Sequence, residues 1–209
     1  MMNAKLKRVF IIHGWEADPE SNWFPWLKKE LEKNGFKAIV PAMPNSAQPK
    51  CEEWVDCLKK VIGKVDEETI LVGHSLGAIT ILNYLACLKK GDKVGGVILV
   101  SGSDENPGFP ELDSFFEIKI DYEKTINTVG NIPTPAQSAR DHHYPESGIS
   151  STGFMVIHSD NDSVVPLELG QKMAKALKAE FIVIPGGEHL NAGDGFFEFP
   201  LVLEKIMSL

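Results

Sequence analysis

The sequence predicts an α/β fold with about six mostly parallel strands and helices on both faces of the sheet. Short apolar runs rich in branched residues alternate with amphipathic segments along the whole chain. This order is typical of parallel strands joined by crossover helices that cover both faces. The length of 209 residues fits one domain, 1–209, large enough to bury its own core, and no repeat or linker interrupts it.

The first half of the chain begins with a short apolar run at residues 9–12. An amphipathic segment follows, with Trp23, Leu27 and Leu31 on one face and Gly35 as a stop signal. The next apolar run ends at Pro41 because proline cannot continue a strand ladder. We expect strands at residues 9–12, 36–40 and 70–72, and helices at residues 22–34, 51–62 and from 78 onward.

The second half repeats the alternation of strand and helix. We expect strands at residues 97–100, 154–158 and 181–184, and helices at residues 167–177 and 196–207. Together with the first half, this gives about six strands. Their carboxyl ends meet at one edge of the sheet, where open parallel sheets build their sites.

Residues 127–153 form a loop-like insertion in this scheme. They contain Pro133, Pro135 and Pro145, several Ser and Thr, and few apolar residues. A structureless loop of this length is unusual in a compact domain, so a surface insertion and a lid over the active site are both open interpretations. The run Asp141-His142-His143 within it is too weak a signal to predict a metal site, and we predict neither a metal nor an organic cofactor.

The charge pattern excludes some classes of partner. With a formal net charge of −8 and a pI near 5.3, the chain lacks the basic face that nucleic acids or anionic membranes require. No apolar run reaches the length of a membrane span, and the N-terminus does not resemble a signal peptide. The three cysteines lack a C-x-x-C spacing and suggest a reducing compartment. We therefore expect a cytoplasmic protein.

A G-x-S-x-G motif, Gly73 to Gly77, lies where the strand at residues 70–72 changes to the helix from Ala78. This context is typical of a nucleophile elbow, which presents a serine at the end of a strand. Residues without bulky side chains are needed beside the serine because strand and helix approach closely there. Ser75 is therefore the candidate nucleophile.

A serine nucleophile needs a base and an acid that orients the base, and in this type of fold they follow in the order Ser, Asp or Glu, His. The turn after residues 154–158 contains Asp160 and Asp162. His189 lies in a Gly-rich turn one strand later, at the same edge. We favour Asp162 as the acid because it has the D-x-x-V-P spacing seen in many serine hydrolases, although Asp160 is a competitor.

The turn His13-Gly14-Trp15 leaves the first strand at the same edge of the sheet. Its backbone amides can join the amide of Leu76 in an oxyanion hole. We expect Trp15 to supply the second donor through its main chain.

These residues resemble the alpha/beta-hydrolase fold, and more narrowly the small serine hydrolases similar to retinoblastoma-binding protein nine, also called YdeN-like. The matching residues span nearly the whole chain: His13-Gly14, the run from Trp23 to Leu27, Met43-Pro44, Trp54, the elbow with Ala78, the acid loop from Ser159 to Pro166 and the run from Gly187 to Asn191. The resemblance implies a serine hydrolase with a Ser75, Asp162, His189 triad, active on small ester-like acyl groups. The insertion at 127–153 departs from that group because it is longer than its compact fold needs.

Two functions follow from this resemblance and from the motifs. The first is hydrolysis of a small carboxylester or thioester through an acyl-enzyme on Ser75. The alternative is a protein-binding module on a hydrolase scaffold with little or no turnover, because a fold does not fix a function. The partner of such a module is not specified by the sequence.

Overall fold

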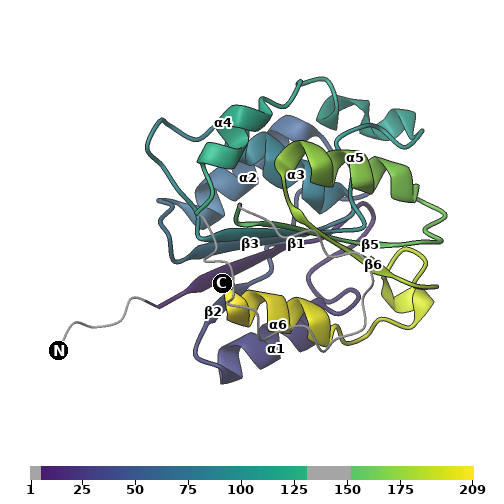
Figure 1. Ribbon diagram of the computed structural model, residues 1–209, viewed down its shortest axis with the longest axis horizontal. Helices are drawn as coiled ribbons and strands as arrows, with labels where there is room; N and C mark the ends of the chain where they lie inside the picture. The colour runs from purple at the N-terminus through teal and green to yellow at the C-terminus, as the bar shows by residue number, and fades with distance from the viewer. Residues whose placement is uncertain (1–5, 131–151) are drawn as a thin grey trace.

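The computed structural model describes residues 6–130 and 152–209 as a single sheet of six strands, all parallel, between two layers of helices (Figure 1). The strand order is β2-β1-β3-β4-β5-β6. The strands are β1 (Arg8–Ile12), β2 (Lys37–Ile39), β3 (Thr69–His74), β4 (Gly96–Val100), β5 (Phe154–Ser159) and β6 (Glu180–Ile184). The helices are α1 (Phe24–Lys33), α2 (Cys51–Ile62), α3 (Leu76–Ala86), α4 (Tyr122–Asn127), α5 (Leu167–Leu177) and α6 (Pro200–Ser208), with the 3₁₀ turns η1 (Pro110–Phe115) and η2 (Ala192–Asp194).

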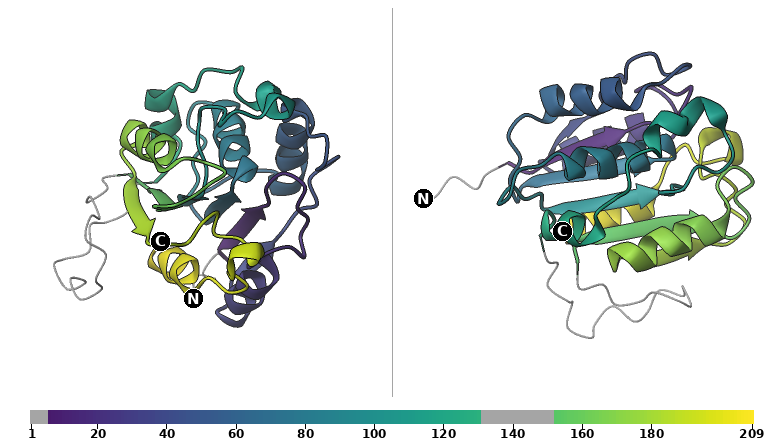
Figure 2. Two further views of the ribbon diagram at one scale, coloured as in Figure 1. Left: turned by 90° about the vertical axis from the view of Figure 1, so that its right-hand side faces the viewer. Right: turned by 90° about the horizontal axis from the view of Figure 1, so that it is seen from above.

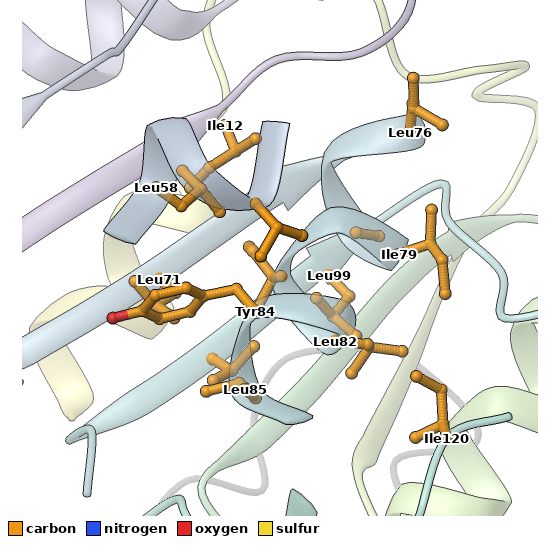
Figure 3. Packing of buried hydrophobic residues seen from close by; sticks show 14 of the residues in the cluster. Ile12, Leu58, Leu71, Leu76, Ile79, Leu82, Tyr84, Leu85, Leu99 and Ile120 are labelled. Atoms are coloured by element: carbon orange, nitrogen blue, oxygen red, sulfur yellow. The ribbon is translucent and has the colours of Figure 1, made fainter. Parts of the chain in front are cut away.

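Two apolar clusters hold the layers to the sheet. Helices α1 and α6 lie side by side under one face (Figure 2) and bury Trp23, Leu27 and Val202 against it. Helices α2, α3 and α5 cover the other face. There the side chains of α3 pack on the sheet, with Leu82 near Leu99 and Tyr84 near Leu71 (Figure 3). Because both faces are covered, all six residues of β3 are buried.

The direction in which the chain adds strands to the sheet changes between β1 and β3. From β1 the chain continues to β2 on one side, and from β3 it continues to β4 on the other. Ligand sites of open parallel sheets lie beyond the carboxyl ends of the strands at such a switch point. The loops after β1 and β3, which contain Trp15 and Ser75, both leave the sheet here.

The predicted alternation of strands and helices is confirmed, and the sheet is wholly rather than mostly parallel. The predicted helices at 51–62 and 167–177 have the observed bounds. The helix predicted from 196 begins instead at Pro200, because Asn191 caps a 3₁₀ turn and Gly195 follows in a left-handed conformation with φ 92°. Helix α4 and turn η1 were not predicted.

The predicted insertion at 127–153 is shorter than expected at its first end. Asn127 is the last residue of α4, and Val129 forms a parallel bridge with Val94. The Val97 amide donates to the Gly153 carbonyl at 2.9 Å, next to the first pair of residues that joins β5 to β4. Residues 131–151, including Asp141-His142-His143, lie outside the described residues, so the choice between insertion and lid stays open.

No helix in ranges 6–130 and 152–209 is long and apolar enough to cross a bilayer.

Candidate active site

The turn between β3 and α3 holds Ser75 in a conformation that residues with a side chain rarely adopt, with φ 54° and ψ −121°. The strain is kept because the surrounding backbone is tightly packed. A Cβ atom on Gly73 would lie 2.7 Å from the carbonyl of Gly77, and one on Gly77 would lie 2.3 Å from the carbonyl oxygen of Ile12. Glycine is therefore required at both positions, as the elbow interpretation predicts.

Three loops bring the predicted side chains together in one hydrogen-bonded series. The Ser75 Oγ atom lies 3.0 Å from His189 Nε2. On the other side of the ring, His189 Nδ1 lies 2.9 Å from Asp162 Oδ2 and 3.1 Å from Oδ1. Because a carboxylate only accepts, Nδ1 carries the hydrogen and Nε2 is free to accept the serine proton.

The two candidate acids have different surroundings. The Asp162 side chain is fully buried, and its Oδ1 atom also accepts from the amides of Val164 and Val165 at 2.9 Å. Burial alone would raise the pKa of Asp162, but the bonds from His189 and the two amides outweigh it and hold the pKa below its ordinary value. Asp160 is exposed and accepts from the Gly186 amide at 2.7 Å. Of these two carboxylates, Asp162 is the one that contacts the His189 ring.

The two proposed oxyanion donors lie beside Ser75. Trp15 and Leu76 line the same cavity as the serine. Within the described residues neither main-chain N–H has a hydrogen-bond acceptor, whereas the next amide, that of Glu16, donates to Ser46. A Cβ atom on Gly14 would lie 3.0 Å from Ser75 Cβ, so this glycine lets the loop after β1 approach the nucleophile.

The loop around His189 is fixed through its main chain. The His189 amide donates to Asp194 at 2.9 Å, and the indole N–H of the fully buried Trp23 donates to the Leu190 carbonyl at 3.0 Å. From the acid loop, Asn161 accepts from the Glu188 amide at 2.9 Å. These bonds set the position of the imidazole, and sequence inspection did not single out Trp23, Asn161 or Asp194 for this role.

His74 lies directly behind His189. Its Nε2–H donates to the His189 carbonyl at 3.0 Å, and the two rings are 5.1 Å apart. Complete burial lowers the pKa of His74 to about 3, with the nearby His189 adding to the effect. His74 therefore stays neutral and acts as a packed support for the histidine loop. In the sequence, His74 is only the variable residue between Gly73 and Ser75 of the motif.

Two further histidines are buried and structural. His13 donates from Nδ1 to the Gly14 carbonyl at 2.8 Å and accepts from the Met43 amide at 3.0 Å. His158 donates to the Ser159 carbonyl at 3.1 Å. Burial lowers the pKa of both rings. Through its bonds to Gly14 and Met43, His13 connects the turn that contains Trp15 to the loop after β2.

An apolar cavity opens at Ser75. It is lined by Trp15 from the loop after β1, by Leu76 and Ile79 from α3, by side chains of the segment 103–116 and by Val164 and Val165 of the acid loop. Figure 3 shows Leu76 and Ile79 at successive turns of α3. In the part of the chain that the structure describes, no group of three or more His, Cys, Asp or Glu side chains could hold a metal ion.

Comparisons with known proteins found similar sequences and a similar structure. A family model described as serine hydrolase matches residues 9–208. The protein YdeN of Bacillus subtilis (strain 168) is 34% identical over 203 residues, which cover 97% of this chain and 95% of YdeN. Serine hydrolase RBBP9 of Rattus norvegicus is 31% identical over 109 residues, 51% of this chain and 56% of that protein. The crystal structure of the B. subtilis ydeN gene product superposes with a TM-score of 0.83 at 33% identity, covering 97% of both chains.

Proposed function

Because the chain belongs to the serine hydrolase family, we propose that it hydrolyses small ester-like substrates, carboxylesters or thioesters, through an acyl-enzyme on Ser75. The observation that supports this most strongly is the unbroken series from Ser75 Oγ through His189 to Asp162. Ser75 also lines a cavity with Trp15 and Leu76, whose main-chain amides have no acceptor within residues 6–130 and 152–209. The expected cytoplasmic location remains a prediction from the sequence.

In the proposed reaction His189 Nε2 takes the proton of Ser75 as the serine oxygen attacks the acyl carbonyl. The amides of Trp15 and Leu76 stabilise the oxyanion that forms, and Leu76 has the added advantage of lying at the amino end of α3, where the helix dipole favours negative charge. His189 then gives the proton to the leaving alcohol or thiol. Water then enters, loses a proton to His189 and attacks the acyl carbonyl. The bond from the acyl carbon to Ser75 Oγ breaks, His189 returns the proton to that oxygen, and the acid leaves.

Asp162 has two tasks in this scheme. It holds the imidazole so that Nε2 faces the serine, and its charge stabilises the imidazolium that forms during each step. The low pKa of Asp162, caused by its bonds to His189 and the loop amides against the effect of burial, keeps the carboxylate ionised at neutral pH.

Labelling with a fluorophosphonate probe tests the proposal. We expect the wild-type protein to be labelled and to hydrolyse p-nitrophenyl acetate, and the Ser75→Ala variant to do neither. Ser103→Ala is the matched control, since Ser103 lines the same cavity but its hydroxyl donates to the Glu105 carbonyl. A wild-type protein that is neither labelled nor active would contradict the proposal and favour the alternative of a binding module.

A further inference from the structure

The cavity beside Ser75 has a direction relative to the reacting atoms. Among the described residues its lining includes Trp15 and Leu76, which carry the proposed oxyanion amides, but neither His189 nor Asp162. The leaving group must face His189 Nε2 in order to be protonated. Since the leaving group faces the histidine, the acyl chain is the part of the substrate that remains to enter the cavity lined by Trp15 and Leu76.

From this arrangement we propose that the cavity is an acyl-binding pocket that selects short, uncharged acyl groups, an inference that rests on the proposed function. Among the described residues that line the cavity, none has an ionisable side chain other than Ser75 itself, and the remaining ones are apolar apart from Ser103. A charged acyl group would lose its hydration without gaining a partner there.

The size of the cavity limits the length of the acyl chain. The space open to the centre of a water molecule is about 40 Å³. Since about 10–15 Å³ of such space holds one water, the cavity has room for roughly three or four non-hydrogen atoms. The alkyl part of acetyl, propionyl or butyryl groups fits, whereas longer chains exceed this space.

The wall is held in place by its own hydrogen bonds. The side chain of Asn106 accepts from the amides of Gly108 and Phe109 at 2.9 and 2.8 Å, and donates to the Phe109 carbonyl and to Asp113 at 2.9 and 2.7 Å. Further along, the Phe115 carbonyl accepts from the buried Asn83 at 2.8 Å. Leu112, which lines the cavity, lies between these two anchors along the chain and is 6% exposed. We therefore expect a sharp limit rather than an adaptable pocket.

The test is a series of p-nitrophenyl esters from acetate to octanoate. In a tight apolar pocket one additional methylene changes kcat/KM by about tenfold or more. We expect kcat/KM to be highest between acetyl and butyryl and to fall at least about tenfold by octanoyl. A second series of aryl acetates with leaving groups of increasing size should show no comparable limit.

Variants identify the wall. Leu112→Ala should shift the preferred acyl chain toward hexanoyl without changing the leaving-group profile. If Leu112→Ala does not fold, Ile79→Val takes its place; it removes one methyl group and should give a smaller shift in the same direction. Ile118→Ala is the matched control because Ile118 follows the same segment but is 55% exposed and lies outside the lining. Its profile should equal that of the wild type.

The outcomes separate the two proposals. A flat acyl profile, or a Leu112→Ala shift confined to the leaving group, would overturn the pocket assignment while labelling of Ser75 left the proposed function intact. A wild-type protein that shows neither labelling nor turnover would overturn the proposed hydrolase function itself.

Discussion

At the scale of single residues, the candidate site combines one residue with a strained backbone and two whose side chains are held by hydrogen bonds. Ser75 carries the strain of a positive φ, whereas His189 and Asp162 have hydrogen-bond partners on every side that matters for proton transfer. Strain at the nucleophile persists only because neighbouring groups fix it. Residues that support His189 and Asp162 should therefore affect turnover although they touch no substrate.

Replacing the acid separates the two aspartates. Asp162→Asn keeps the size of the side chain but cannot hold the imidazole in the tautomer needed, so kcat should fall on the order of 10³–10⁴-fold. Asp160→Asn removes only the charge of an exposed side chain that accepts a hydrogen bond from the Gly186 amide. As is usual for surface substitutions, kcat should change less than about threefold. Steady-state kinetics on p-nitrophenyl acetate measures both, and the opposite order would make Asp160 the acid.

The buried histidines should make stability depend on pH. His74 stays neutral in the folded protein down to about pH 3, whereas its ordinary pKa is 6.5, so only the unfolded chain takes up the proton between these values. The stability that this residue contributes is thus complete above pH 6.5 and is lost as the pH falls toward 3. The lowered pKa values of His13 and His158 act in the same direction.

Urea unfolding at several pH values measures this effect. Below pH 6.5 the free energy of unfolding should decrease by up to about 1.4 kcal/mol per pH unit for each proton taken up. His74→Asn, which keeps a donor for the His189 carbonyl, should reduce the slope by about one proton. A stability that is constant from pH 6.5 to pH 4 would contradict the burial argument.

At the scale of elements, helices far from the chemistry position the site. Helix α1 lies under the face opposite α3, yet the residue that precedes it, Trp23, reaches the histidine loop through its indole N–H. On the other side, the N-terminus of α2 and turn η1 are linked by the Cys51 amide, which donates to Ser114. The pocket wall and the base are thus attached to different layers.

Trp23→Phe tests the link from α1 to the base. The variant leaves the buried Leu190 carbonyl without a donor, which should cost about 1–3 kcal/mol of stability and loosen the His189 loop, so that kcat falls more than KM changes. Trp26→Phe is the matched control, since Trp26 lies within α1 and is only partly buried against the same cluster. Equal kinetic effects of the two substitutions would show that the indole bond has no special role.

Asn106→Ala tests whether the pocket wall is preorganised. The variant loses four hydrogen bonds around turn η1, so the ratio of butyrate to octanoate kcat/KM should decrease while acetate turnover changes little. Asn34→Ala is the control. It also removes a hydrogen bond from a side-chain amide, the one to the Glu30 carbonyl, but at the far end of α1. A butyrate to octanoate ratio that is unchanged in Asn106→Ala would mean that packing alone holds the wall.

At the scale of the whole molecule, the site follows from the topology. The switch in strand order places the loops after β1 and β3 together, and β5 and β6 add the acid and histidine loops at the same edge. Motif order and edge placement were therefore enough to predict that Ser75, Asp162 and His189 meet. Long amphipathic helices such as Cys51–Ile62 were predicted with their bounds because their apolar period is regular.

The remaining features depend on contacts that leave no local pattern. The bond from Trp23 to Leu190 joins residues 167 positions apart, and the support of His189 by His74 spans 115 positions. Short elements such as α4 and η1 have too few residues for a period to emerge, and the start of α6 was decided by the cap at Asn191. The pocket wall could not be predicted for the same reasons.

The most direct test of the central claim is to trap the acyl group on the protein. After rapid mixing with p-nitrophenyl butyrate and acid quenching, intact-mass and peptide analysis should show one butyryl group on the peptide that contains Ser75, and none in the Ser75→Ala variant. A butyryl group on another residue, or turnover that is unchanged in Ser75→Ala, would contradict the proposed acyl-enzyme.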